Sequence, residues 1–236
     1  MKVTVRIWDF PIRLFHWLLV LAVVAAYVTA TLGGSLMDWH GRIGSLILGL
    51  LVFRLIWGFI GTTYARFGNF FPTLPRVVAY LKGQWQGAGH NPLGAFAVFA
   101  LLAVLSVLVG TGLCASDDIA FEGPLYSLVD DDGLRDKLSG WHAQAFNVLL
   151  GLLALHLSAI IYYRGVKKTN LVGPMLTGKK QIPKTAATTV TGGGVLRFFS
   201  TVVISGVVVW AVWGGVEFIR PVASAPAPVA AAAPSF

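Results

Sequence analysis

The sequence predicts an all-α membrane protein, and three observations support that fold class. Of the 236 residues, 56% are hydrophobic and only 12% are charged, whereas a soluble domain usually holds about 25% charged residues. Five apolar stretches each approach the roughly 20 residues that a helix needs to cross a membrane. Basic residues gather in alternate segments between these stretches, which is typical of a multi-pass protein.

The predicted membrane spans cover residues 15–31, 40–60, 93–114, 141–163 and 195–216. Residues 1–184 would form one bundle, 185–194 a polar, Gly-rich linker, and 195–216 a fifth helix. The last residues, 217–236, are rich in Ala and Pro and are expected to form a tail without a core of their own.

Charge sets the predicted orientation. Three segments are net basic and contain Lys2, Arg6, Arg13, Arg66, Arg76, Lys82, Arg164, Lys167, Lys168, Lys179, Lys180 and Lys184. The loop between the third and fourth spans is acidic, with Asp117, Asp118, Glu122, Asp130, Asp131, Asp132 and Asp136. Because cytoplasmic loops carry the Lys and Arg excess, we expect a cytoplasmic amino terminus and a carboxyl terminus on the opposite side of the membrane. The net charge of +8 therefore reflects membrane orientation, and no nucleic-acid partner is expected.

Two histidines, His142 and His156, lie fourteen residues apart in the fourth span. An α-helix returns to within roughly 40° of its starting face after fourteen residues and rises about 21 Å. One helix face would therefore carry an imidazole near each surface of a hydrocarbon core about 30 Å thick. Ionisable groups inside a span are costly and indicate function, and imidazole is a common axial ligand of haem iron.

The predicted topology sorts four histidines into two levels. His16 and His156 share the inner level, and His40 and His142 share the outer level. Each pair can supply both axial ligands of a haem b. Cys114 is the sole cysteine and there is no C-x-x-C-H motif, so covalent c-type attachment is excluded. The alternatives are hydrogen-bonded packing histidines, a proton-relay transporter without haem, and a haem-free anchor; a zinc site would need four ligands at one point.

Three further residues lie toward the inner side. Asn91 followed by Pro92 is typical of a helix start, and His90 precedes them. The alternative for these residues is a polar pocket beside the inner haem. Arg54 lies in the inner half of the second span, where it would either extend to the interface or meet a haem propionate.

Together these residues resemble the bacterial two-haem membrane cytochromes b of the b561 type, particularly the cytochrome b subunits of nickel-iron hydrogenases. The resemblance covers about residues 4–181. Its matching residues are Ile7-Trp8-Asp9, Arg13, Phe15-His16-Trp17, Arg54, Trp57-Gly58, Ala65-Arg66-Phe67, Gly89-His90-Asn91-Pro92-Leu93-Gly94, His156 and Thr177-Gly178-Lys179-Lys180.

The resemblance implies a four-helix bundle that holds two haem b groups, with His16, His40, His142 and His156 as ligands. In the related formate dehydrogenase cytochrome b, an Asn at the start of the third span helps to form a quinone pocket, and Asn91 is at the matching place. With the predicted orientation, the resemblance implies a multi-pass protein of the bacterial inner membrane whose carboxyl terminus is periplasmic. The expected function is electron transfer between the quinone pool and a periplasmic redox partner, either a c-type cytochrome or a hydrogenase small subunit. The alternative within redox chemistry is a stand-alone superoxide:quinone oxidoreductase.

Overall fold

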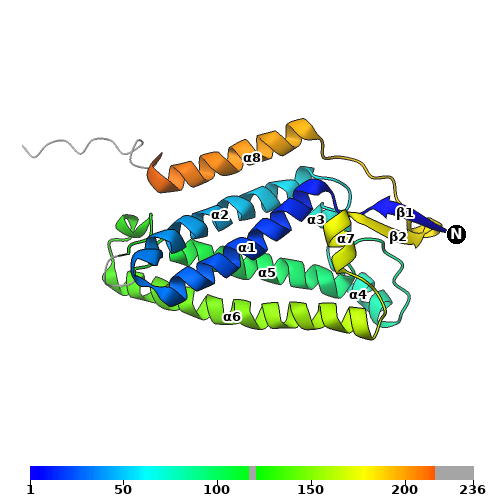
Figure 1. The fold of residues 1–236 in the computed structure, drawn as a ribbon, viewed down its shortest axis with the longest axis horizontal. Helices are drawn as coiled ribbons and strands as arrows, with labels where there is room; N and C mark the ends of the chain where they lie inside the picture. Colours follow the sequence, from blue (N-terminus) through cyan, green and yellow to red (C-terminus); the bar gives the residue numbers. More distant parts are fainter. Residues whose placement is uncertain (117–120, 216–236) are drawn as a thin grey trace, which may run out of the picture.

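The computed structural model describes residues 1–116 and 121–215, and long helices dominate it (Figure 1). Five helices in these residues are long and apolar enough to cross a membrane, which confirms the predicted all-α membrane fold. Four of them run side by side as a bundle: α1 (Phe10–Leu32), α2 (Met37–Ile60), α5 (Pro92–Gly112) and α6 (Asp132–Gly165). The fifth, α8 (Val195–Trp210), packs against α2 and ends in a π-helical turn, Ala211–Gly215.

Helix α6 begins nine residues before the predicted span. Its first turns are polar, so hydropathy marks only its apolar part. The side chain of Asp131 accepts a hydrogen bond from the backbone N–H of Leu134 (2.7 Å) and caps the helix. The apolar part of α6 thus continues a helix that starts outside the hydrocarbon region.

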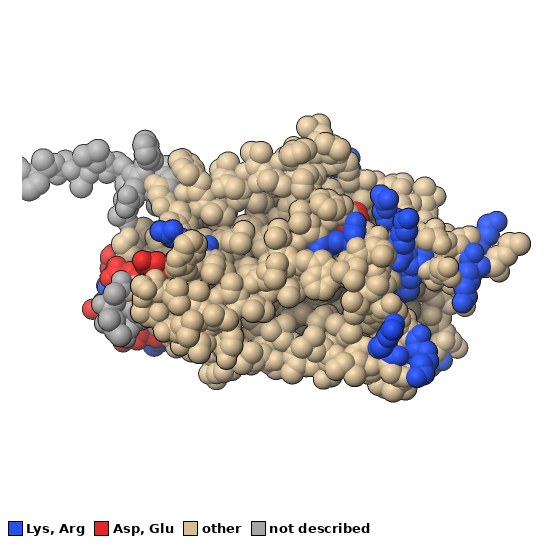
Figure 2. Space-filling view, viewed as in Figure 1, with Lys and Arg blue, Asp and Glu red and all other residues tan. Residues whose placement is uncertain are grey.

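Short elements complete the structure: the 3₁₀ turns η1 (Gly34–Leu36), η2 (Tyr126–Leu128) and η3 (Lys184–Ala186), and the helices α3 (Phe67–Phe70), α4 (Leu74–Leu81) and α7 (Val172–Thr177). Strands β1 (Lys2–Arg6) and β2 (Lys179–Pro183) form an antiparallel pair that runs from Lys2 opposite Pro183 to Arg6 opposite Lys179. Lys and Arg side chains gather at the end of the bundle near this sheet, and acidic side chains gather at the opposite end (Figure 2). We call these the basic end and the acidic end.

Asp9 connects the first two helices at the basic end. Its Oδ1 accepts from the backbone N–H of Ile12 (2.8 Å) and caps α1. Its Oδ2 accepts from the Trp57 indole N–H (2.9 Å) and from the Thr62 hydroxyl (2.7 Å). The carboxylate is buried, so it fixes the start of α1 against the end of α2.

The segment predicted as a linker is hydrogen-bonded to the bundle. Thr63 donates its backbone N–H to Thr191 O (2.9 Å), and Thr191 returns a bond to the Thr63 hydroxyl (2.8 Å). This contact turns the chain back so that α8 lies along α2, where Thr201 and Ser205 are buried. The fifth helix is therefore packed on the bundle, and the predicted tail lies outside the described residues.

Gly58 allows α2 to approach α3 closely. A Cβ atom at this position would lie 2.0 Å from Cε2 of Phe67, whose buried ring packs against Phe70 and Phe99. By contrast, a Cβ atom at Gly151 on α6 would meet nothing within 4 Å.

We expect Gly58→Ala to lower the free energy of unfolding by about 1–3 kcal/mol, because a packed ring must move. Gly151→Ala is the matched control and should be neutral or slightly stabilising, since Ala is the better helix former. Thermal unfolding of the purified proteins in one detergent compares them. Equal midpoints for the two variants would show that the approach of α2 to α3 is not constrained by packing.

Candidate functional site

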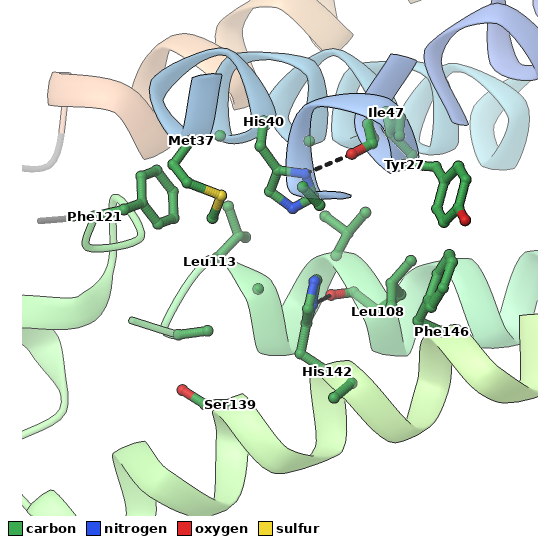
Figure 3. Close-up of a pocket in the computed structure, with 18 of the residues that line it drawn as sticks. Tyr27, Met37, His40, Ile47, Leu108, Leu113, Phe121, Ser139, His142 and Phe146 are labelled. Carbon is green, nitrogen blue, oxygen red and sulfur yellow. Dashed lines mark hydrogen bonds between the residues drawn. The ribbon is translucent and has the colours of Figure 1, made fainter. Parts of the chain in front are cut away.

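At the acidic end, His40 and His142 face one another across the bundle (Figure 3). His40 extends from α2 and His142 from α6; their ring centroids are 6.1 Å apart and the ring planes make an angle of 85°. Nδ1 of His40 lies 2.9 Å from the carbonyl oxygen of Ala26, and Nδ1 of His142 lies 2.8 Å from that of Leu108. A carbonyl only accepts, so Nδ1 carries a proton in both rings and Nε2 is the nitrogen through which each ring could bind a metal.

The two rings border a cavity of about 350 Å³. Its walls are mostly apolar and come from all four bundle helices, including Val23, Ala26, Ile47, Val109, Leu113 and Leu149. Tyr27 and Phe146 stack with centroids 5.6 Å apart and form part of the wall between α1 and α6. An apolar cavity with a few convergent polar atoms is typical of a cofactor site.

The geometry of the imidazole pair fits a metal ion between the rings. A metal bonded to an imidazole nitrogen on each side at about 2 Å holds the ring centroids roughly 6 Å apart, and the observed distance is 6.1 Å. The carbonyl bonds to Nδ1 are the usual support of a metal-ligating histidine. Within the described residues no group of three His, Cys, Asp or Glu could hold a metal ion. Two imidazoles are an axial ligand set of a haem iron, whose other ligands come from the porphyrin.

Three glycines leave room around this pair, and sequence reasoning missed them. A Cβ atom at Gly112 would lie 2.7 Å from Cε1 of His142, and one at Gly41 would lie 2.7 Å from Cε2 of Phe121. Gly44 lines the cavity, and a Cβ atom there would meet nothing within 4 Å. The signal in the sequence was the pair Gly41 and Gly44, close after His40 in a largely apolar helix.

The second predicted pair lies closer to the basic end. His16 on α1 and His156 on α6 are near enough for their charges to interact. The His16 and Trp17 rings are in edge-to-face contact, with their centroids 5.0 Å apart. The buried Nδ1 of His16 has no hydrogen-bond partner within the described residues. Leu149 lies midway between His142 and His156 along α6 and is only 1% exposed. The structure therefore keeps the two histidine levels on one helix, with an apolar side chain between them.

Arg54 is buried beside the Asp9 junction. Only 3% of the residue is exposed, and its guanidinium carbon lies 4.3 Å from the centroid of the Phe67 ring. Asp9 is close enough to interact with it electrostatically. Arg54 therefore does not extend to the surface, which was one of the two sequence-based expectations for this residue.

His90 is held between the rings of Trp8 and Phe70, each with its centroid 4.5 Å away. Burial, followed by the nearby Arg54 and Lys180 cations, lowers the His90 pKa to about 3. The imidazole is therefore neutral at physiological pH. Lys180, on β2, donates to the carbonyl oxygen of Ala88 (3.3 Å), and burial lowers its pKa.

Asn91 begins α5 as the sequence predicts. Its Oδ1 accepts from the backbone N–H of Gly94 (2.7 Å), and Pro92 is the first helical residue. Its Nδ2 donates to the hydroxyl of Tyr163 (2.6 Å), which in turn hydrogen-bonds to the hydroxyl of Tyr80 on α4. Sequence reasoning missed Tyr80 and Tyr163. Tyr163 lies seven residues after His156 on α6, and the same interval separates Leu149 from His142 and from His156.

Residues 7–178 match the sequence model of the family described as Prokaryotic cytochrome b561. A probable Ni/Fe-hydrogenase B-type cytochrome subunit of Azotobacter vinelandii is 26% identical over 172 residues, which cover 59% of this chain and 67% of the relative. A probable Ni/Fe-hydrogenase 1 B-type cytochrome subunit of Escherichia coli K12 is 24% identical over 144 residues, 45% of this chain and 59% of the relative. A probable Ni/Fe-hydrogenase B-type cytochrome subunit of Rhizobium leguminosarum bv. viciae is 20% identical over 212 residues, 75% of this chain and 89% of the relative. No solved structure shows significant similarity to the chain.

Proposed function

Because the chain belongs to the prokaryotic cytochrome b561 family, we propose that it is a transmembrane cytochrome with two haem b groups. It passes electrons between a periplasmic redox partner and the membrane quinone pool. The observation that carries the proposal is the facing pair of His40 and His142, whose separation fits an iron between them. The family match and the second pair, His16 with His156, support a haem at each level.

Each haem iron would accept and release one electron, and the protein controls where that happens. His40 and His142 would hold the haem near the acidic end, with both rings oriented by backbone carbonyls. His16 and His156 would hold the other. The fourteen residues between the two α6 ligands rise about 21 Å, so one helix supports both positions across the membrane. The apolar walls around the cavity exclude water and favour simple electron transfer over side reactions.

Haem content tests this proposal. We expect a pyridine haemochrome assay on purified protein to give two haems per chain. His40→Ala or His142→Ala should remove one haem, and His16→Ala or His156→Ala should remove the other, because each loss leaves an iron without an axial ligand. Lys179→Gln, at an exposed position on β2, is the control and should retain both. A colourless, folded protein, or a ligand variant that keeps both haems, would overturn the assignment.

The proposed orientation places the basic end in the cytoplasm and the acidic end in the periplasm. The separation of charge along the bundle supports it (Figure 2). Glu122, Asp130, Asp131, Asp132 and Asp136 would then lie near the proposed outer haem. A negative surface there would attract a positively charged face of a c-type cytochrome or of a hydrogenase small subunit. The similarity to hydrogenase B-type cytochrome subunits supports a partner of this class.

Reporter fusions test the orientation. We expect alkaline phosphatase fused after Arg220 to be active, since the enzyme folds in the periplasm, and the same enzyme fused after Lys184 to be inactive. Fusion protein levels serve as the control. The reverse pattern of activity would place the His40 and His142 pair on the cytoplasmic side.

We place quinone chemistry at the basic end, beside the His16 and His156 level. Asn91 supports this position because its capping bond and its bond to Tyr163 leave one N–H donor and one acceptor lone pair available for a quinone carbonyl.

Asn91→Asp tests this site because the carboxylate can still cap α5 but has no N–H donor. The rate at which a quinone analogue oxidises the reduced haems should fall about tenfold. This corresponds to an activation free energy that is higher by about 1.4 kcal/mol. Both haem spectra should be unchanged. Asn170→Asp is the matched control, since Asn170 Oδ1 also accepts from a backbone N–H three residues later, that of Gly173 (3.0 Å). Normal kinetics in a stable Asn91→Asp protein would move the quinone site elsewhere.

A further inference from the structure

Two cations and a neutral imidazole gather inside the basic end of the bundle. Arg54 extends from α2, Lys180 from β2 and His90 from the turn before α5, and the charges of Arg54 and Lys180 both act on His90. Arg54 is 97% buried, since only 3% of it is exposed. We call these three residues the cation cluster.

One carboxylate lies near the two cations of the cluster. It is Asp9, whose charge acts on Arg54 and whose two oxygens already accept three hydrogen bonds, from Ile12, Trp57 and Thr62. Across residues 1–116 and 121–215, an ion pair within 4.0 Å forms only between Arg135 and Asp132 at the acidic end. Arg54 and Lys180 therefore have no direct salt-bridge partner in this part of the chain.

Two buried nitrogen atoms of the cluster also lack hydrogen-bond partners. Nη1 of Arg54 and Nδ1 of His90 are buried, and neither finds an acceptor in the described residues. A buried unpaired charge costs several kcal/mol, and native proteins avoid it by pairing the group. A guanidinium with a free nitrogen is suited to a carboxylate or a phosphate, which it can bind with charge-assisted hydrogen bonds.

The position of the cluster indicates which anion this is. Asp9, which interacts with Arg54, precedes His16 on the same chain by seven residues, about 10 Å along a helix. The cluster thus lies between the His16 level and the basic end. The two propionates are the only charged groups on the edge of a haem b.

We propose that Arg54, with Lys180 and His90, binds the propionate carboxylates of the haem held by His16 and His156. The inference rests on the proposed di-haem function. Arg54 is a positioning and charge-balancing residue and does not touch the iron. The neutral His90 donates a hydrogen bond to a carboxylate, and Lys180 adds the second positive charge.

The reduction potential reports this contact directly. Reduction of a ferric haem adds one negative charge, so a nearby cation stabilises the reduced form. Arg54→Gln should lower the midpoint potential of the inner haem by at least 59 mV. For a one-electron couple this shift corresponds to a tenfold change in the equilibrium constant for reduction. The outer haem should keep its potential. Arg54→Lys retains the charge and should recover most of the loss.

A second pair of variants controls for folding. Lys180→Gln should shift the inner haem in the same direction by a smaller amount, and Lys179→Gln, on the exposed neighbour in β2, should have no effect. If the Arg54→Gln protein binds less haem than the wild type, loss of the inner haem with retention of the outer haem supports the proposal. Spectra of the His16→Ala protein identify which signal is the inner one.

Three results would overturn the proposal. The first is an Arg54→Gln protein with two haems and unchanged potentials, which leaves the di-haem function intact. The second is an inner potential in the wild-type protein that depends on added inorganic phosphate or on removal of phospholipid, because the anion is then not the haem's own carboxylate. The third is a wild-type protein without haem, which overturns the proposed function as well.

Discussion

A polar side chain inside a lipid-embedded bundle must find a partner, and this constraint organises the whole structure. Water is absent from the hydrocarbon region, so an unpaired donor or charge there is costly. At the acidic end, His40 and His142 satisfy one nitrogen each with the carbonyls of Ala26 and Leu108. Their other nitrogens face the cavity. The unsatisfied atoms of the bundle thus point to what the protein binds.

Asp9 meets the same constraint at the basic end and sets the relative depth of the helices. By capping α1 and accepting bonds from Trp57 and Thr62, it fixes the start of α1 to the end of α2. His16 therefore has a defined height in the bundle, and His40 is placed at the far end of α2, where it reaches Ala26. The close approach of Gly58 to Phe67 holds the same region together. Local capping and packing thereby determine the positions of the histidine levels.

The helices were predictable because apolar length and charge alternation are strong signals, and the α6 spacing put His142 and His156 on one face. The β1–β2 pair was not predictable, since its strands are five residues long and lie more than 170 residues apart in the chain. The capping role of Asn91 could be read from Asn-Pro, whereas its bond to Tyr163 depends on how α5 meets α6. The buried state of Arg54 likewise depends on Phe67 and Asp9, which reach it only in the folded bundle.

We propose that His40 with His142, and His16 with His156, each supply both axial ligands of a haem iron. Electron paramagnetic resonance of the oxidised, purified protein tests it most directly, because two imidazole ligands force ferric haem into the low-spin state. We expect two low-spin signals that together integrate to two spins per chain, with strong anisotropy at the outer site, where the ring planes make an angle of 85°. A high-spin ferric signal, a single low-spin haem or a protein without haem signals would contradict it.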